Sequence, residues 1–424
     1  MKFATVLVAY VYACASAFAL PAFHQSTNPT APAFASSNEV GAVYLITNEP
    51  AGNMVIAGSL SSNGKVAFKE AISTRGLGAH ITSNGDPDGL QSQGSIKASA
   101  TGGFLVAVNA GSSTVSMFKI NPQDPTSLQQ VGQPVSSGGE FPVSAAINKK
   151  GTQVCVLNAG LVNGVNCYTV DKNLGLIRQA DTLRSLNLAS DDGPSVSAAH
   201  QVAFNDANDK LIVTVAGAPG SIAVFDVSSS GALSQSFTTI TPPGAGTNGP
   251  FSLTALAGKN AMLSADVNLG LDVFDLSSVS ASNVTGATNQ TVAASGQSTS
   301  LALDGQKATC WSSFSSKTGN FYLSDAGSSV LTEINLDQNL KPTVVKQYPQ
   351  TNGSATLDSD VAKLGNKDFL YVLAAGKTAI DVLSLDGPGD ANSVGSFEFA
   401  SIAKASGLTV NAANVQGMTT FVKA

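Results

Sequence analysis

The sequence predicts an all-β fold, a seven-bladed β-propeller whose blades form one ring. A strand pattern recurs in which an apolar residue is followed three positions later by a bulky apolar residue and five positions later by Ile, Val or Leu. Its copies are Val55–Leu60 (degenerate, with Gly58 at the bulky position), Val115–Ile120, Val165–Val170, Ile222–Val227, Leu271–Leu276, Leu331–Leu336 and Ile380–Leu385. They begin 60, 50, 57, 49, 60 and 49 residues apart, and repeats of about this length built from short strands are typical of propeller blades.

Composition and alternation support this prediction. Charged residues make up 12% of the 424 residues, against about 25% in an average protein, and the 41 glycines suit many tight turns. Because side chains alternate between the faces of a strand, the pattern places apolar residues on both faces. Such a sheet must be covered on both sides, which requires neighbouring blades and a closed ring.

The order of the elements predicts how the ring closes. After the first blade, the inner strands are expected near Ser95–Ala98, Phe141–Ala146, Ala199–Phe204, Phe251–Thr254, Thr299–Ala302 and Leu357–Asp360. The first blade, which contains Val43–Ile46, has no inner strand before it. The C-terminal segment Asn414–Phe421 is predicted to supply that strand, so residues 41–424 would form one domain closed by its last strand.

The N-terminal residues predict secretion. Residues 1–19 have one positive charge, a short apolar stretch and small residues near Ala19, as in a signal peptide. Residues 20–40, rich in Pro, Ala, Ser and Thr, are expected to be a flexible lead-in, and no later stretch is apolar enough to span a membrane. We expect a secreted or cell-wall-associated glycoprotein with glycosylation sequons at Asn283, Asn289 and Asn352.

Three cysteines follow the predicted signal peptide. Cys155 and Cys167 lie symmetrically about a turn near Leu161, so they would face each other across a hairpin, and we predict a disulfide between them. Cys310 is then expected to be an unpaired, buried thiol.

Charge and motifs exclude several functions. The net charge of −6 disfavours binding to nucleic acid or to an anionic membrane. The chain has no zinc pattern, phosphate-binding loop, nucleophile elbow or dinucleotide fingerprint, and no metal or cofactor is expected. We expect a monomer.

The run Phe104–Ile120, followed by Asn121–Thr126 and Gly139–Ser144, resembles the lactonase-type seven-bladed propeller family. That family includes bacterial 6-phosphogluconolactonase and fungal carboxymuconate lactonizing enzyme, and the chain is most similar to its secreted fungal branch, known as 3-carboxymuconate cyclase. The resemblance covers roughly residues 40–424. It implies a site at the ring centre, where the inner strands begin, often with the sequence Gly-Pro-Arg-His-x-x-Phe. Here the fourth blade has Ser197–Phe204, in which His200 matches and Ala199 replaces the arginine.

The family reactions act on anionic substrates, for which arginine is the usual partner. The chain has only Arg75, Arg178 and Arg184. Arg178 and Arg184 fall in the outer part of the third blade, so Arg75 alone lies near a plausible central loop.

Lactone hydrolysis also needs a base to activate water and a group that stabilises the oxyanion. His200 is the best candidate base, with His80 beside Arg75 as a partner and Glu140 as a second acid or base. The alternatives are a hydrogen-bonded structural role for His200, a solvated loop position for His80 and a surface position for Glu140. Of Asp358 and Asp360, one would face the channel, or both would accept hydrogen bonds from backbone donors.

Two functions are therefore expected from the sequence. The first is a cofactor-independent lactonase or cycloisomerase that acts on a small-molecule lactone at the central channel. The second is a non-catalytic extracellular or wall-associated propeller that binds a glycan, peptide or small molecule. The scarcity of arginine favours the second function, and the family resemblance favours the first.

Overall fold

The computed structural model describes residues 39–81, 85–189, 198–217, 220–244, 249–279 and 289–423. The predicted signal peptide, residues 20–38 of the predicted lead-in and the sequon at Asn283 lie outside these ranges. The first strand already begins at Glu39, two residues before the predicted start of the propeller domain.

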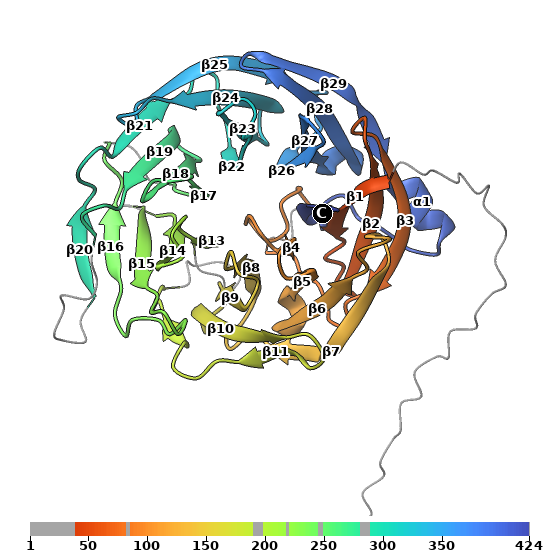
Figure 1. Cartoon of the computed structure of the whole chain (residues 1–424), viewed down its shortest axis with the longest axis horizontal. Helices are drawn as coiled ribbons and strands as arrows, with labels where there is room; N and C mark the ends of the chain where they lie inside the picture. Colours follow the sequence, from red (N-terminus) through yellow and green to blue (C-terminus); the bar gives the residue numbers. More distant parts are fainter. Residues whose placement is uncertain are drawn as a thin grey trace, which may run out of the picture. The chain divides into compact units, whose positions relative to one another are not determined.

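Seven sheets, antiparallel except for one parallel pair in the fourth, form a ring, as Figure 1 shows, and we number them blades 1 to 7. Blade 1 contains, from the channel outward, β30 (Gln416–Val422), β1 (Glu39–Ile46), β2 (Met54–Ser61) and β3 (Val66–Ser73). Blade 2 contains β4 (Ile96–Ser99), β5 (Phe104–Asn109), β6 (Thr114–Ile120) and β7 (Leu128–Ser136). Blade 3 contains β8 (Pro142–Ile147), β9 (Gln153–Asn158), β10 (Gly164–Asp171), β11 (Gly175–Arg178) and β12 (Arg184–Ser185).

The later blades follow the same plan. Blade 4 contains β13 (Ala199–Phe204), β14 (Lys210–Val215), β15 (Ser221–Asp226), β16 (Thr238–Thr241) and β20 (Gln290–Ala293). Blade 5 contains β17 (Thr254–Ala255), β18 (Ala261–Asp266), β19 (Gly270–Asp275) and β21 (Thr299–Ala302). Blade 6 contains β22 (Thr309–Phe314), β23 (Phe321–Asp325), β24 (Val330–Leu336) and β25 (Pro342–Pro349), and blade 7 contains β26 (Thr356–Leu364), β27 (Lys367–Ala374), β28 (Ala379–Gly387) and β29 (Asp390–Glu398).

Helical structure is minor in the described ranges. It consists of η1 (Ala110–Ser112), η2 (Ala375–Lys377) and α1 (Ala400–Ala405). None of the helices in the described part of the chain is long and apolar enough to cross a membrane.

The ring closes as predicted, with the last strand inside the first blade. β30 pairs antiparallel with β1, from Gly41 opposite Val422 to Ile46 opposite Gln416. Blade 7 also holds β30, because Asp358 accepts a hydrogen bond from the Gly417 amide (3.0 Å) and Asp360 accepts one from the Thr420 amide (2.7 Å). The two aspartates therefore satisfy backbone donors, one of the alternatives that the sequence left open.

The repeated strand pattern marks the packing between blades. In the last six copies, the first and fourth residues of the pattern are at most 4% exposed. They belong to hydrophobic clusters that extend from one blade to the next. The apolar residues on both faces are thus buried between neighbouring sheets, as expected from the alternation.

The predicted start of the sixth blade was wrong. Thr299–Ala302 is β21, which pairs with β19 at the outer edge of blade 5, and the inner strand of blade 6 is β22. The intervening β20 pairs in parallel with β16 of blade 4. An alternating strand pattern does not tell an inner strand from an outer one, so this detour of the chain was not visible in the sequence.

We predict that Gly41→Ala weakens ring closure. A Cβ at Gly41 would lie 2.3 Å from the carbonyl oxygen of Phe421, whereas a Cβ at Gly52 meets nothing within 4 Å. The collision should push β30 away from β1 and cost roughly 1–3 kcal/mol, as overpacking usually does. Thermal unfolding should show a lower melting temperature for Gly41→Ala, with earlier proteolysis near the C-terminus, and no change for the control Gly52→Ala. Equal melting temperatures for the two variants would contradict this role of Gly41.

Candidate functional site

The seven inner strands surround a central channel and run in the same direction along it. We call the two ends of this channel the strand-start end and the strand-end end. The family resemblance places a catalytic site at the strand-start end, so its contents decide whether that site is available.

The chain itself fills the strand-start end. The segment Asp88–Ser95, which we call the plug, leads from the long loop after β3 into β4, and Figure 1 shows this part of the chain inside the ring. The Ser92 carbonyl accepts hydrogen bonds from Trp311 Nε1 of blade 6 (2.9 Å) and from Gln416 Nε2 of blade 1 (2.7 Å). The Ser92 hydroxyl donates to the Val143 carbonyl of blade 3 (2.8 Å). The plug therefore connects blades that are not adjacent in the ring.

Gln93 of the plug bonds to blades 3 and 6. Its Nε2 donates to the Ser312 carbonyl (2.9 Å), and its Oε1 accepts from the Ser312 amide (3.1 Å). The backbone carbonyl of Gln93 accepts a hydrogen bond from the Ser144 hydroxyl (2.7 Å). Since Ser92, Gln93 and Ser95 are at most 5% exposed, these bonds form in a water-poor environment, where they hold the plug firmly.

His200 also binds the plug. Its Nδ1 lies 2.7 Å from the Gln91 carbonyl, and because a carbonyl can only accept, Nδ1 carries the proton. The ring stacks on Phe251 with 4.6 Å between centroids, and burial lowers the pKa of His200 to about 4. A group with this pKa is a weak base at neutral pH, so the contacts favour the structural interpretation of His200.

The other predicted site residues lie in loops. Arg75 is exposed in the loop after β3, and His80 contacts the Asp86 carbonyl through Nε2 (3.0 Å) in the same loop. Glu140 is exposed and accepts a hydrogen bond from the Val162 amide (3.3 Å) at the β9–β10 turn. His80 lies close to the plug that His200 contacts, since a Cβ at Gly89 would lie 3.0 Å from the His80 ring.

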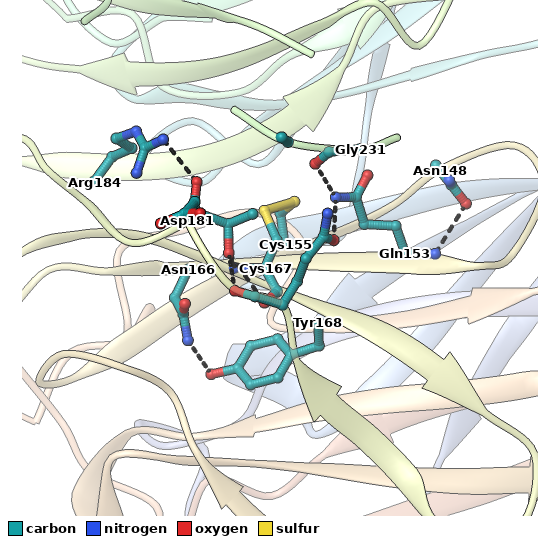
Figure 2. Close-up of a disulfide and its surroundings, with 12 residues drawn as sticks. Asn148, Gln153, Cys155, Asn166, Cys167, Tyr168, Asp181, Arg184 and Gly231 are labelled. Carbon is teal, nitrogen blue, oxygen red and sulfur yellow. Dashed lines mark hydrogen bonds between the residues drawn. A yellow bond between two sulfur atoms is a disulfide. The ribbon is translucent and has the colours of Figure 1, made fainter. Parts of the chain in front are cut away.

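Arg184 is occupied by blade packing, as Figure 2 shows for its contact with Asp181. Its guanidinium donates to the carbonyls of Asp181 (2.6 Å), Leu183 (2.9 Å), Leu233 (2.7 Å) and Ser234 (2.6 Å). These bonds join blade 3 to the segment that follows β15. Arg184 therefore has no part in binding a substrate anion.

The disulfide in Figure 2 lies in the same blade. Cys155 on β9 is directly opposite Cys167 on β10, and the two are bonded. Cys310 is a free, buried thiol, and burial raises its pKa well above the usual range. A thiol in this state is unreactive.

Two carboxyl groups meet beside the plug. Burial and the charge of Asp358 raise the pKa of Asp88 well above its usual range. Burial raises the pKa of Asp358 to about 7, although the Gly417 amide and Lys97 lower it. Asp358 Oδ1 has no hydrogen-bond partner among the described residues.

The strand-end end of the channel is open. It contains a chamber of about 340 Å³ lined by the inner strands of blades 2 to 7. Its polar lining includes Lys97, Gln201, Thr254, Ser313, Ser359 and Asp360, and its apolar lining includes Phe204 and Phe314. Lys149 at the rim is paired with Asp206 (2.6 Å), whereas Lys97 forms no ion pair within the described part of the chain.

The chamber can bind polar groups, and its lining includes four ionisable residues. Lys149 and Asp206 are paired with each other, whereas Lys97 and Asp360 form no ion pair in the described part of the chain. No group of three or more His, Cys, Asp or Glu in the described ranges could hold a metal ion. The arrangement is therefore suited to hydrogen bonding and to acid–base chemistry.

Sequence reasoning missed the plug and Lys97. The long loop after β3 was visible, and long loops in compact domains are usually functional. Nothing in its sequence shows that its last residues enter the channel, because the partners of the plug lie up to 328 residues away, as for Asp88 and Gln416.

Comparisons with known proteins agree with the fold. A family model described as a lactonase with a seven-bladed β-propeller matches residues 33–191, which include blades 2 and 3 and the three N-terminal strands of blade 1. The match and the ring together support a lactonase-type seven-bladed β-propeller. A search of curated proteins found no significant match.

Similar structures come from bacteria. A periplasmic gluconolactonase of Pseudomonas aeruginosa is 15% identical with a TM-score of 0.60, covering 91% of this chain and 100% of that one. A candidate 6-phosphogluconolactonase of Bacteroides uniformis is 14% identical with a TM-score of 0.62, covering 90% and 100%. A protein of unknown function from Desulfotomaculum acetoxidans is 12% identical with a TM-score of 0.60, covering 91% and 100%. At these identities the likeness shows a shared fold.

We predict that Asp358 makes stability depend on pH. Its folded-state pKa of about 7 lies above its ordinary value of 3.8, so the folded protein keeps the proton to a higher pH than the unfolded chain. Stability should therefore fall as the pH rises from about 4 to 7. Asp358→Asn retains an acceptor for Gly417 and cannot ionise, so its melting temperature should exceed that of the wild type at pH 8.5 and differ less at pH 5.

The control is Asp386→Asn, because Asp386 is exposed and hydrogen bonds from Ser384 and Asn392 lower its pKa. This control should show no gain between pH 5 and 8.5. A wild-type melting temperature that stays constant over this range, with no gain for Asp358→Asn, would show that Asp358 is ionised in the folded protein.

Proposed function

We propose that this lactonase-like propeller binds a small, polar, uncharged molecule of the sugar or sugar-lactone class in the chamber. The observation that carries the proposal is the contrast between the two ends of the channel. The strand-start end is filled by the plug, and the strand-end end is an open, polar chamber.

The lining of the chamber fits this ligand class. Its volume of about 340 Å³ is at the small end of the usual range for ligand sites. Hydroxyl and amide side chains from blades 4 to 7 converge on it, and Phe204 and Phe314 offer apolar faces. One unpaired lysine cannot neutralise a tricarboxylate, so carboxymuconate cyclisation receives less support than binding of an uncharged ligand.

Lactone hydrolysis is a second candidate, supported by the family match and by the ionisable groups of the chamber. Asp360 would take a proton from water as the water oxygen attacks the lactone carbonyl. Lys97 would stabilise the negative charge on the carbonyl oxygen. The ring C–O bond would then break, and the ring oxygen would take up a proton, leaving the open hydroxy acid without any cofactor.

Secretion and glycosylation are part of the same proposal. The disulfide suits an oxidising compartment, and Asn289 and Asn352 are exposed, as attached glycans require. A mass decrease after treatment of the natively produced protein with an N-glycosidase would support the proposal, whereas unmodified Asn289 and Asn352 would contradict it. The assignment to a secreted fungal branch also stays a proposal.

We predict that filling the chamber abolishes binding. Binding of D-glucose, D-glucono-1,5-lactone and 6-phosphogluconate should be measured by calorimetry and by ligand-observed NMR. The uncharged probes should bind the wild type, and Ala255→Phe at the chamber wall should weaken binding at least about tenfold by overpacking the site. Ala67→Phe on the exposed β3 is the control. Binding that survives in a folded Ala255→Phe variant would place the site elsewhere.

We predict that any lactonase activity depends on the chamber. Loss of a general base costs roughly 10²–10⁴ in rate, and loss of an oxyanion partner about 10²–10³. Asp360→Asn and Lys97→Met should therefore lose turnover of D-glucono-1,5-lactone while the uncharged probes still bind. Binding without turnover in the wild type would support a binding protein. Unchanged turnover in both variants would exclude these roles.

We predict that His200→Ala lowers stability and spares the chamber. The change leaves the Gln91 carbonyl without its donor, at a cost of about 1–3 kcal/mol, and removes the ring that stacks on Phe251. The melting temperature should fall, while binding of the uncharged probes stays within about twofold, since His200 contacts the plug. Loss of binding or turnover at unchanged melting temperature would show that His200 belongs to the functional site.

A further inference from the structure

A second cavity lies between blades 1, 2 and 3, away from the chamber. This groove has a volume of about 520 Å³ and contains residues from the β4–β5 turn, β6, the β10–β11 turn and the end of the closing strand β30. Its apolar residues are Phe104, Met117, Ile120, Pro122 and Phe421. Since Phe104, Met117 and Ile120 are at most 3% exposed, they form a firm apolar floor.

The charges around the groove all have one sign. Lys119, Lys172 and Lys423 line it, and none of its lining residues is Asp or Glu. Within the described ranges the ion pairs involve Lys69, Lys149 and Lys210, so these three ammonium groups have no carboxylate partner there. Asp171, next to Lys172, already accepts hydrogen bonds from the Asn173 (2.8 Å) and Leu174 (2.9 Å) amides of its own turn.

We infer that the groove binds a small amphipathic anion, an organic carboxylate with an apolar body. The apolar floor would take up the body, and the three lysines would attract the carboxylate at the rim. The lysines fit this arrangement because long basic side chains lay their stems along apolar surface and keep the ammonium in water. The net charge of the chain is −6, so the positive charge of the groove is opposite in sign to the net charge of the whole protein.

The inference is independent of the proposed function. The groove and the chamber share no lining residue. Phe421 of the closing strand β30 lines the groove, and so does Lys423, the residue after the end of that strand. The Lys423 amide donates a hydrogen bond to the Val40 carbonyl (2.9 Å). A ligand that contacts β30 and blades 2 and 3 together would bind the closed ring and not an opened one, so it should raise the melting temperature.

The test uses decanoate as the probe, with decan-1-ol and decyltrimethylammonium as neutral and cationic probes of equal chain length. Binding to the full-length protein is measured by calorimetry at low salt, and the melting temperature is measured with each probe. Decanoate should bind and raise the melting temperature. The other two probes should bind at least about fivefold more weakly, since each exposed ion pair contributes up to a factor of about five and three lysines line the groove. Raising the salt concentration should weaken only decanoate binding.

Two variants locate the site. Lys119→Gln/Lys172→Gln/Lys423→Gln should weaken decanoate binding by about tenfold or more, and Ala100→Phe should obstruct the groove for every probe. The matched control, Lys65→Gln/Lys363→Gln/Lys377→Gln, changes the net charge equally at exposed positions outside the groove and should leave binding unchanged. The inference is overturned if decanoate does not bind, if decan-1-ol binds as tightly, or if the control triple variant loses as much affinity as the groove variant.

Discussion

Each blade of this protein needs a neighbour on both faces, because the repeated strand pattern gives every sheet two apolar faces. An open chain of seven such sheets would expose an apolar face at either end. The insertion of β30 beside β1 removes both exposed faces at once, since it makes blade 1 from the two ends of the described chain. Asp358 and Asp360 add polar bonds across the same boundary. The channel and its contents exist only because this closure succeeds.

The plug follows from the closed ring. A ring of seven sheets leaves an axial space, and here the segment Asp88–Ser95 fills one end of it with hydrogen bonds to blades 1, 3, 4 and 6. The groups that bind the plug, including His200 and Trp311, would otherwise point into an open channel. Their polar atoms form hydrogen bonds to the plug. The polar groups available to a ligand therefore lie at the opposite end, where Lys97 and Asp360 line the chamber.

The sequence predicted the architecture well because the repeat is a property of short segments. The first and fourth pattern residues are buried in all seven copies, and the closing strand was located to within two residues. The site could not be predicted in the same way. His200 matched a family motif, but its role depends on the Gln91 carbonyl, 109 residues earlier in the chain. No feature of the sequence singles out Lys97, because its position at the chamber depends on the path of the plug.

Asp360 connects the closure to the chamber. Its Oδ2 accepts hydrogen bonds from the Thr420 amide and hydroxyl and from the Thr419 hydroxyl, all on β30, and the same residue lines the chamber. A ligand that contacts this carboxylate would therefore contact a group that already holds the ring closed. Binding and ring closure should then stabilise each other, because a ligand that favours the closed ring is favoured by it to the same extent.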